Sequence, residues 1–192
     1  MRGFRGIMVL GMLMSFCCEK ASLPRDTFPN RGTVSVLRNG DFLQENIRIN
    51  GTVIKYNGKQ DCNIFIIRER PNDSIERRQE EMNFLGIDLN DQIGDTLCLS
   101  DTDIFLPEED FQCVGNAYHT LIGGDVLGDR YKLQTGEDHY LIITEWNAEN
   151  FTVSGKFQAS YVFAEEKHET EWMEDTVRYT NGKFTTTLEL KE

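Results

Sequence analysis

Two acidic stretches of the sequence hold the residue types that bind metal cations. One adjoins Trp172 and comprises Glu165, Glu166, His168, Glu169 and Glu171. Carboxylate oxygens with one imidazole form a donor set suited to a divalent cation. The other comprises Asp101, Asp103, Glu108, Glu109 and Asp110, and its spacing does not match a calcium-binding loop. Solvated loops are the simpler interpretation of both stretches, so we predict no metal and no other cofactor.

The sequence lacks the motifs of the common catalytic sites. Its histidines, His119, His139 and His168, are scattered, and no HExxH, GxSxG, phosphate-binding loop or dinucleotide-binding glycine pattern occurs. A glycosidase needs two carboxylates about 5–10 Å apart, but a chain with 32 acidic residues contains such pairs by chance. We therefore predict a non-enzymatic protein, with a polysaccharide hydrolase that uses a carboxylate pair as the alternative.

Aromatic residues offer a second kind of site. Trp146, Trp172 and Tyr161 could form a surface that stacks against a sugar or a peptide, although large aromatic residues on strands more often belong to the core. We keep Trp146 and Trp172 as candidate contact residues and favour core packing for them.

Three cysteines, Cys62, Cys98 and Cys113, lie in the body of the chain. None has the CxxC spacing of a redox or zinc site. Cys98 and Cys113 could form a disulfide while Cys62 stays buried and reduced, since an exported domain can form disulfides. The odd count leaves this pairing open.

The elements that must position these residues follow a repeat of two, which is typical of half-buried β-strands. The longest example runs from Phe151 to Phe163. Its alternate residues fall on one apolar face: Phe151, Val153, Gly155, Phe157, Ala159, Tyr161 and Phe163. A glycine inside such a run, here Gly155, predicts a bulge or a sharp bend.

Other segments extend the β pattern. Further strands are predicted at Ile47–Tyr56, Ile64–Ile67, Leu141–Trp146, Thr176–Thr180 and Phe184–Leu190. Two-residue hairpin turns are predicted at Asn39-Gly40, Asn57-Gly58 and Asn181-Gly182. A helix from Asp73 to Gly86 is one interpretation of the intervening segment, because Asp73 and Glu76 have the spacing of a helix start. We favour a strand from Glu80 to Leu89, which agrees with the β surroundings.

Together these elements predict an all-β fold, either an antiparallel β-sandwich or a partly closed β-barrel. We expect it to occupy residues 33–192 as a single domain. The formal net charge of −12 argues against nucleic acid as a partner, because an acidic surface repels a phosphate backbone.

The first residues have the features of a removable export segment. A basic head precedes the apolar stretch Ile7–Met14, which is too short to cross a bilayer. The stretch ends at two cysteines, and this resembles the lipobox of bacterial lipoproteins, in which a small residue precedes a lipidated cysteine. Cys18 follows the small Cys17, whereas Cys17 follows the bulky Phe16. Cys18 is therefore the expected lipidation site, with Cys17 as the alternative.

This assignment divides the N-terminal region in two. Residues 1–17 are predicted to be a lipoprotein signal peptide, and residues 18–32 a tether between the lipid and the domain. A palmitate-bearing anchor would hold the protein at a membrane of the cell envelope. We expect the outer membrane, and the sequence leaves open whether the domain faces the periplasm or the cell surface.

Three segments of the C-terminal half occur in a familiar order: Leu141–Trp146, Val153–Phe157 and Val177–Phe184. They resemble the pattern ITxxD…VSGTFxF…VxITNGxF of small lipoproteins of unknown function from Bacteroidota. The segment Ile93–Leu99 is similar to the GTYxL segment of that family. The resemblance implies a shared β-fold and export, and it carries no catalytic residues.

The same resemblance implies a modification. Proteins of such bacteria carry O-glycans where Asp-Ser or Asp-Thr is followed by an apolar residue. This pattern would place glycans on Ser74, Thr96 and Thr176.

The function that these observations favour is a membrane-anchored envelope lipoprotein that presents a non-catalytic β-domain for binding. Its ligand would be a glycan, a peptide or a partner protein. Two alternatives remain: the polysaccharide hydrolase, and a structural subunit of an outer-membrane complex.

Overall fold

A computed structural model describes residues 30–43, 47–56, 59–69, 78–102, 113–123 and 126–191. All regular secondary structure in these residues is β-strand. The strands are β1 (Gly32–Arg38), β2 (Asp41–Leu43), β3 (Ile47–Tyr56), β4 (Lys59–Glu69), β5 (Gln79–Asp88), β6 (Leu97–Asp101), β7 (Val114–Ile122), β8 (Val126–Leu133), β9 (Tyr140–Asn147), β10 (Thr152–Phe163), β11 (Thr176–Thr187) and β12 (Glu189–Lys191). No helix long and apolar enough to span a membrane occurs in the described ranges.

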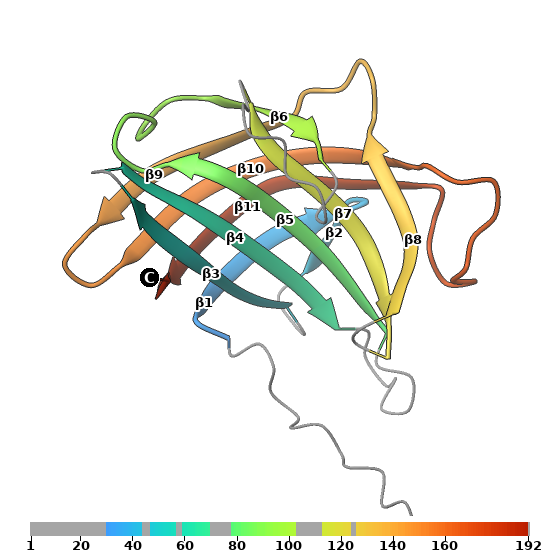
Figure 1. Cartoon of the computed structure of the whole chain (residues 1–192). Coiled ribbons are helices and arrows are strands. Elements are labelled where there is room, and N and C mark those ends of the chain that lie inside the picture. The colour runs from blue at the N-terminus through green and yellow to red at the C-terminus, as the bar shows by residue number, and fades with distance from the viewer. Residues whose placement is uncertain are drawn as a thin grey trace, which may run out of the picture.

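The strands form one sheet that curls into a partly closed barrel (Figure 1). Its order is β12-β3-β4-β5-β7-β6-β9-β10-β11-β1-β2, and β8 pairs with both β7 and β10. Two short strand pairs, β12 with β3 and β6 with β7, are parallel, and the other pairs are antiparallel. The predicted all-β fold is therefore confirmed.

β12 and the segment just before β1 both hydrogen-bond to β3. β11 leads into β12, which pairs with β3 through Leu190 and Val53. The Arg31 N–H donates to the Ile49 carbonyl at 2.8 Å, and the Thr187 N–H donates to the Arg31 carbonyl at 3.1 Å. These backbone hydrogen bonds close one end of the barrel.

On the opposite wall, β6 and β8 share one edge of β7. β6 pairs with the beginning of β7, where Ser100 lies opposite Gly115. β8 pairs with the end of β7, where Tyr118 lies opposite Tyr131, and then continues to β10. Ala117 lies where β7 changes partner, and this change of partner leaves room beside the strand.

The core is filled by alternate residues of the strands, as the repeat of two predicts. In β10 the inward residues Val153, Phe157, Ala159 and Tyr161 are at most 1% exposed. Burial of a large apolar side chain contributes about 1.5–3 kcal/mol. Phe151, predicted to begin this face, precedes β10 and has a φ of 55°.

Gly155 marks a bulge, as predicted. The register of β10 against β9 shifts between Ser154 and Gly155. A β-carbon at Gly155 would lie 2.5 Å from the ring of Phe184, so only glycine fits beneath that ring.

The predicted hairpin at Asn181-Gly182 is wrong. β11 is continuous from Thr176 to Thr187, and the pair forms a bulge within it. The register shifts at this point against both β1 and β10. Asn181 has a φ of 55°, and a β-carbon at Gly182 would lie 2.5 Å from the ring of Phe157. A residue with positive φ and a glycine suit a bulge as well as a turn, and here strands on both sides hold the chain straight.

The other strand and turn predictions agree with the structure where it describes them. Asn39 and Gly40 have positive φ and join β1 to β2, as expected of a hairpin turn. β3 has the predicted bounds, β9 covers the strand predicted around Leu141–Trp146, and the predicted Ile64–Ile67 lies within the longer β4. Tyr56 pairs with Lys59 as a two-residue hairpin requires, although residues 57–58 lie outside the described residues.

β5 decides between the two interpretations of the segment before Gly86. It is a strand from Gln79 to Asp88, so the favoured strand is confirmed and a helix reaching Gly86 is wrong. Residues 70–77 lie outside the described residues, as do residues 1–29, which include Cys17 and Cys18. β1 begins at Gly32, within one residue of the predicted start of the domain.

Candidate functional site

A buried carboxylate lies at the centre of the barrel interior. Glu80 of β5 is 4% exposed. Its Oε2 accepts hydrogen bonds from Arg38 Nε at 3.0 Å, the Tyr118 hydroxyl at 2.7 Å and the Tyr179 hydroxyl at 2.8 Å, while Arg68 donates to Oε1. We call these five residues the Glu80 cluster.

The Glu80 cluster is a fully paired network. Arg38 is 8% exposed and also donates to Glu174 at 2.7 Å. Burial opposes the charge on Arg38, but Glu174 and Glu80 overcome this effect and raise its pKa. Burial, reinforced by the charge of Glu80, raises the pKa of Tyr118 and of Tyr179, which keeps both phenols protonated as donors.

The space beside the Glu80 cluster is too small for a ligand. The cavity there measures about 10 Å³, which is at the lower limit for a single water molecule. The hydrogen-bonding groups of the cluster are therefore satisfied by one another, and the cluster serves to stabilise the fold.

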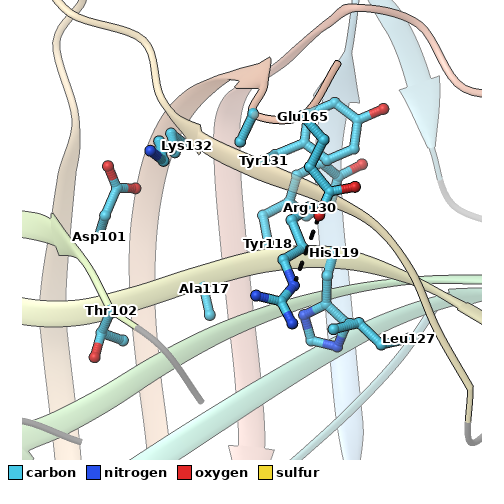
Figure 2. Close-up of a pocket in the computed structure, with 11 residues that line it drawn as sticks. Asp101, Thr102, Ala117, Tyr118, His119, Leu127, Arg130, Tyr131, Lys132 and Glu165 are labelled. Carbon is cyan, nitrogen blue, oxygen red and sulfur yellow. Dashed lines mark ion pairs between the residues drawn. The ribbon is translucent and has the colours of Figure 1, made fainter. Parts of the chain in front are cut away.

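A larger pocket lies on the outer side of the same strands. It measures about 420 Å³, and we call it the outer pocket. Its lining comes from the end of β6, from β7 and β8, and from the segment after β10: Asp101, Thr102, Ala117, Tyr118, His119, Leu127, Arg130, Tyr131, Lys132, Ala164 and Glu165. Figure 2 shows Lys132 and Asp101 on one side of Ala117, and Arg130, His119 and Leu127 on the other.

Strand register aligns three ionisable residues at this pocket. Glu81 of β5 lies opposite His119 of β7, which lies opposite Arg130 of β8. Burial, and then the charge of Arg130, lower the pKa of His119 to about 4. Burial raises the pKa of Glu81, whose Oε2 is 3.9 Å from His119 Nε2. His119 is thus a neutral imidazole at pH 7.

Among the residues that the structure describes, Glu165 is the one carboxylate partner of Arg130, and it is distant. Its Nε lies 3.9 Å from Glu165 Oε1, the contact dashed in Figure 2. Arg178 and Glu137 form an almost equally exposed pair on the protein surface, and their closest atoms are 2.9 Å apart. Arg130 therefore retains donors that can serve a ligand.

Residues 164–175, which we call the strap, connect β10 to β11. His168 joins the strap to β8: Nδ1 is 2.9 Å from Asp129 Oδ2, and Nε2 is 2.9 Å from Asp175 Oδ1. The imidazole also stacks on the Phe163 ring, with 3.7 Å between centroids. Burial opposes the charge on His168, but its hydrogen bonds to Asp129 and Asp175 raise its pKa.

Asp129 anchors the strap from the β8 side. It is fully buried, and Oδ1 accepts the N–H groups of Glu169 at 2.6 Å and Thr170 at 3.2 Å. The Thr170 hydroxyl donates to Oδ2. Burial opposes ionisation, yet the hydrogen bonds from Thr170 and His168 lower the pKa of Asp129.

The described residues of the two acidic stretches do not come together as a set of metal ligands. No group of three or more His, Cys, Asp and Glu side chains in the described ranges is arranged to hold a metal ion. His168 binds Asp129 and Asp175 instead of its glutamate neighbours. Of the second stretch only Asp101 is described, and its Oδ1 accepts the Leu133 N–H at 2.8 Å.

The candidate aromatic residues lie apart from the outer pocket. Trp146 and Trp172 are half-buried against the core, and Trp146 lies 6.2 Å from Phe151 between ring centroids. Tyr161 is fully buried and so cannot belong to a surface platform. Contact of either tryptophan with a ligand stays a prediction.

The remaining predicted sites lie elsewhere. Cys98 and Cys113 form a disulfide, one of the pairings that the sequence left open, and Cys62 is free and buried. Thr96 is exposed, Thr176 is half-buried at the start of β11, and Ser74 lies outside the described residues.

The residues that form the two sites were not predicted as sites. Glu80 had one usable signal, because it falls on the same face of β5 as Met82 and Phe84, and a carboxylate on an apolar face needs partners. Arg130 and His119 have no such signal, since only strand register brings them together. Comparison with protein-family models, curated proteins and solved structures found no match to the chain.

Proposed function

We propose that this protein is a lipid-anchored component of the cell envelope whose β-domain binds a small ligand, or the end of a peptide, in the outer pocket. The observation that carries the proposal is the pocket itself. Its volume of about 420 Å³ lies within the range of ligand-binding pockets. Its wall joins the apolar side chains of Ala117, Leu127 and Ala164 to a larger number of polar and charged ones, which can supply orientation and specificity to a ligand.

The contrast with the barrel interior supports this choice of site. Beside Glu80 the protein fills its own space and pairs its own charges. At the outer pocket the space stays open, and Arg130 lacks a close partner. Binding needs both room and unused hydrogen-bond donors, and these coincide at the outer pocket.

A neutral fluorescent probe tests the binding function. N-phenyl-1-naphthylamine should bind the full chain saturably, because its rings can enter the pocket beside Ala117 and Leu127. Ala117→Phe and Leu127→Trp fill the pocket and should abolish this binding. Ala148→Phe, in the exposed turn after β9, adds the same ring away from the pocket and should not. Unchanged binding in both pocket variants, with folding verified by circular dichroism, would overturn the proposal.

The anchor is tested separately in cells. The proposal rests here on the short apolar stretch and the two cysteines that follow it. Labelled palmitate should be incorporated into the wild-type protein and lost when Cys17 and Cys18 are both changed to alanine. Labelling that survives the double substitution would remove the anchor from the proposal and leave the binding function standing.

A further inference from the structure

We propose that the ligand of the outer pocket is an organic anion, with a single carboxylate or sulfonate group on an apolar body. This inference rests on the proposed function, because it names the class of ligand for that pocket. The observation behind it is that two cations, Arg130 and Lys132, line the pocket of a protein whose net charge is −12.

Neither cation has a close ionic partner. Glu165 is the only described carboxylate within 4.0 Å of the Arg130 guanidinium, at 3.9 Å, and no described carboxylate comes that near to Lys132. Hydrogen bonds to ionised groups have donor–acceptor distances of about 2.7–2.9 Å. The Arg130–Glu165 contact is therefore loose, and an incoming anion can bind the guanidinium without breaking a close hydrogen bond.

The carboxylates of the pocket do not oppose such a ligand strongly. Asp101 uses Oδ1 to accept the Leu133 N–H at 2.8 Å, which fixes its side chain toward β8. Glu165 lies on the exposed strap, where water screens its charge. Glu81 is the carboxylate that shares the strand row of His119 and Arg130, but it does not line the pocket.

His119 extends the donor set without adding a charge of its own. It is 4% exposed and lies opposite Arg130 in the strand register. A neutral imidazole carries one N–H donor, and burial with the nearby Arg130 keeps His119 neutral by lowering its pKa to about 4. A carboxylate or sulfonate beside Arg130 would thus find a guanidinium and an imidazole on adjacent strands.

The apolar body of the ligand follows from the rest of the lining. Leu127, Ala117 and Ala164 line the same space as the cations. A small hydrated ion would leave these surfaces uncovered, whereas an anion joined to a ring or a chain would bury them. The pocket therefore favours an amphipathic acid over an inorganic anion.

Two probes that differ only in charge test this inference. 1-Anilinonaphthalene-8-sulfonate is N-phenyl-1-naphthylamine with an added sulfonate. The sulfonate probe should bind the wild-type chain about tenfold more tightly than the neutral probe, as expected for a charge-assisted contact at a partly exposed site. Arg130→Gln should remove most of that advantage, measured as the ratio of the two affinities in the same variant.

Arg178→Gln is the matched control. Its side chain is 51% exposed against 52% for Arg130, and each arginine faces one glutamate. This substitution should leave both affinities unchanged, and Lys132→Gln provides a second test at the pocket. If the neutral probe binds and the sulfonate adds nothing, or if Arg178→Gln lowers the advantage as much as Arg130→Gln, the ligand class is wrong and the pocket stands. If the Ala117→Phe and Leu127→Trp variants both bind the neutral probe as wild type does, the proposed function itself has failed.

Discussion

The Glu80 cluster and the outer pocket lie on opposite faces of the same strands, and they treat charge in opposite ways. Glu80 and Glu81 are consecutive in β5, as are Tyr118 and His119 in β7. Glu80 accepts four hydrogen bonds inside the barrel. Glu81 comes only within 3.9 Å of His119 on the outside. A strand places successive side chains on opposite faces, so neighbouring residues serve different purposes.

The difference teaches how to tell a structural charge cluster from a binding site. A buried charge is tolerated when every donor and acceptor around it is paired. In the Glu80 cluster this condition is met, and the adjoining cavity has a volume of only about 10 Å³. In the outer pocket the charges are partly exposed, loosely paired and grouped around open space. The first arrangement stabilises the fold, and the second is available to a partner.

Removal of the central carboxylate should give the largest effect. Glu80→Ala leaves the buried Arg38 without one of its two carboxylate partners. It also removes the acceptor of the Tyr118 and Tyr179 hydroxyls. Loss of one member of a buried ion pair costs about 3–5 kcal/mol. Urea unfolding at pH 7 should show this decrease in the free energy of unfolding.

Glu165→Ala is the comparison in the outer pocket. Exposed ion pairs contribute about 0–1 kcal/mol, and this one is 3.9 Å long. The substitution should therefore change stability little. Equal losses for the two substitutions would show that the outer pocket is part of the structural framework and would end the distinction drawn above.

Acidification should act on the fold through His119. The folded protein keeps this imidazole neutral with a pKa of about 4, below the ordinary value of 6.5. The unfolded chain therefore takes up a proton first as the pH falls, and stability that is present above pH 6.5 is lost between pH 6.5 and the folded pKa of about 4. The shift corresponds to a contribution of about 3 kcal/mol.

The substitution His119→Gln isolates this contribution. Glu81, whose pKa is raised by burial, also responds to acid, so the quantity to measure is the difference in stability between wild type and variant at pH 7 and at pH 4. Between pH 7 and pH 4 the free energy of unfolding of the variant should rise relative to that of wild type by about 3 kcal/mol. A difference that stays constant with pH would show that His119 is solvated, and the pocket would then lack its neutral donor.

Much of the fold was predictable because a strand has a simple repeat. Alternation from Phe151 to Phe163 predicted both β10 and its buried face, since the same residues satisfy pattern and packing. The pair Asn181-Gly182 misled because positive φ serves a turn and a bulge alike. Which of these forms depends on β1 and β10, which lie on both sides of β11 but far away in the sequence.

The sites depended on the same long-range information. His168 was considered with its glutamate neighbours, yet its partner Asp129 is 39 residues away. Glu81, His119 and Arg130 lie on three strands, and only the pairing of β5, β7 and β8 aligns them. Sequence patterns describe the faces of single strands, whereas a site between strands requires the register.

Tyr118 tests whether the two regions are coupled, since it lines the outer pocket and donates to Glu80 at 2.7 Å. Tyr118→Phe removes one donor from a buried carboxylate and should lower the free energy of unfolding by about 1–2 kcal/mol. The probe affinities should stay within about twofold of wild type because the hydroxyl points to the interior. Tyr179→Phe loses the equivalent bond outside the pocket. If only Tyr118→Phe weakens binding, the regions are coupled through this ring.

The strap should give the smallest effect, and one that depends on pH in the sense opposite to His119. Both nitrogens of His168 face carboxylates, so the arrangement requires a protonated imidazole. Its raised pKa means that this stabilisation is complete below the unfolded value of about 6.5 and is lost as the pH rises through the folded value. His168→Gln should cost about 1 kcal/mol at pH 6, since the pair is partly exposed, and clearly less at pH 9.

In an Asp129→Asn background the same substitution should cost less at pH 6, because the main acceptor is gone. The strap holds Glu174 against Arg38 and Glu165 near Arg130, and so joins the two regions. If His168→Gln lowers the free energy of unfolding equally at both pH values, the strap is held by the packing of His168 on Phe163 and not by the ion pairs of His168 with Asp129 and Asp175.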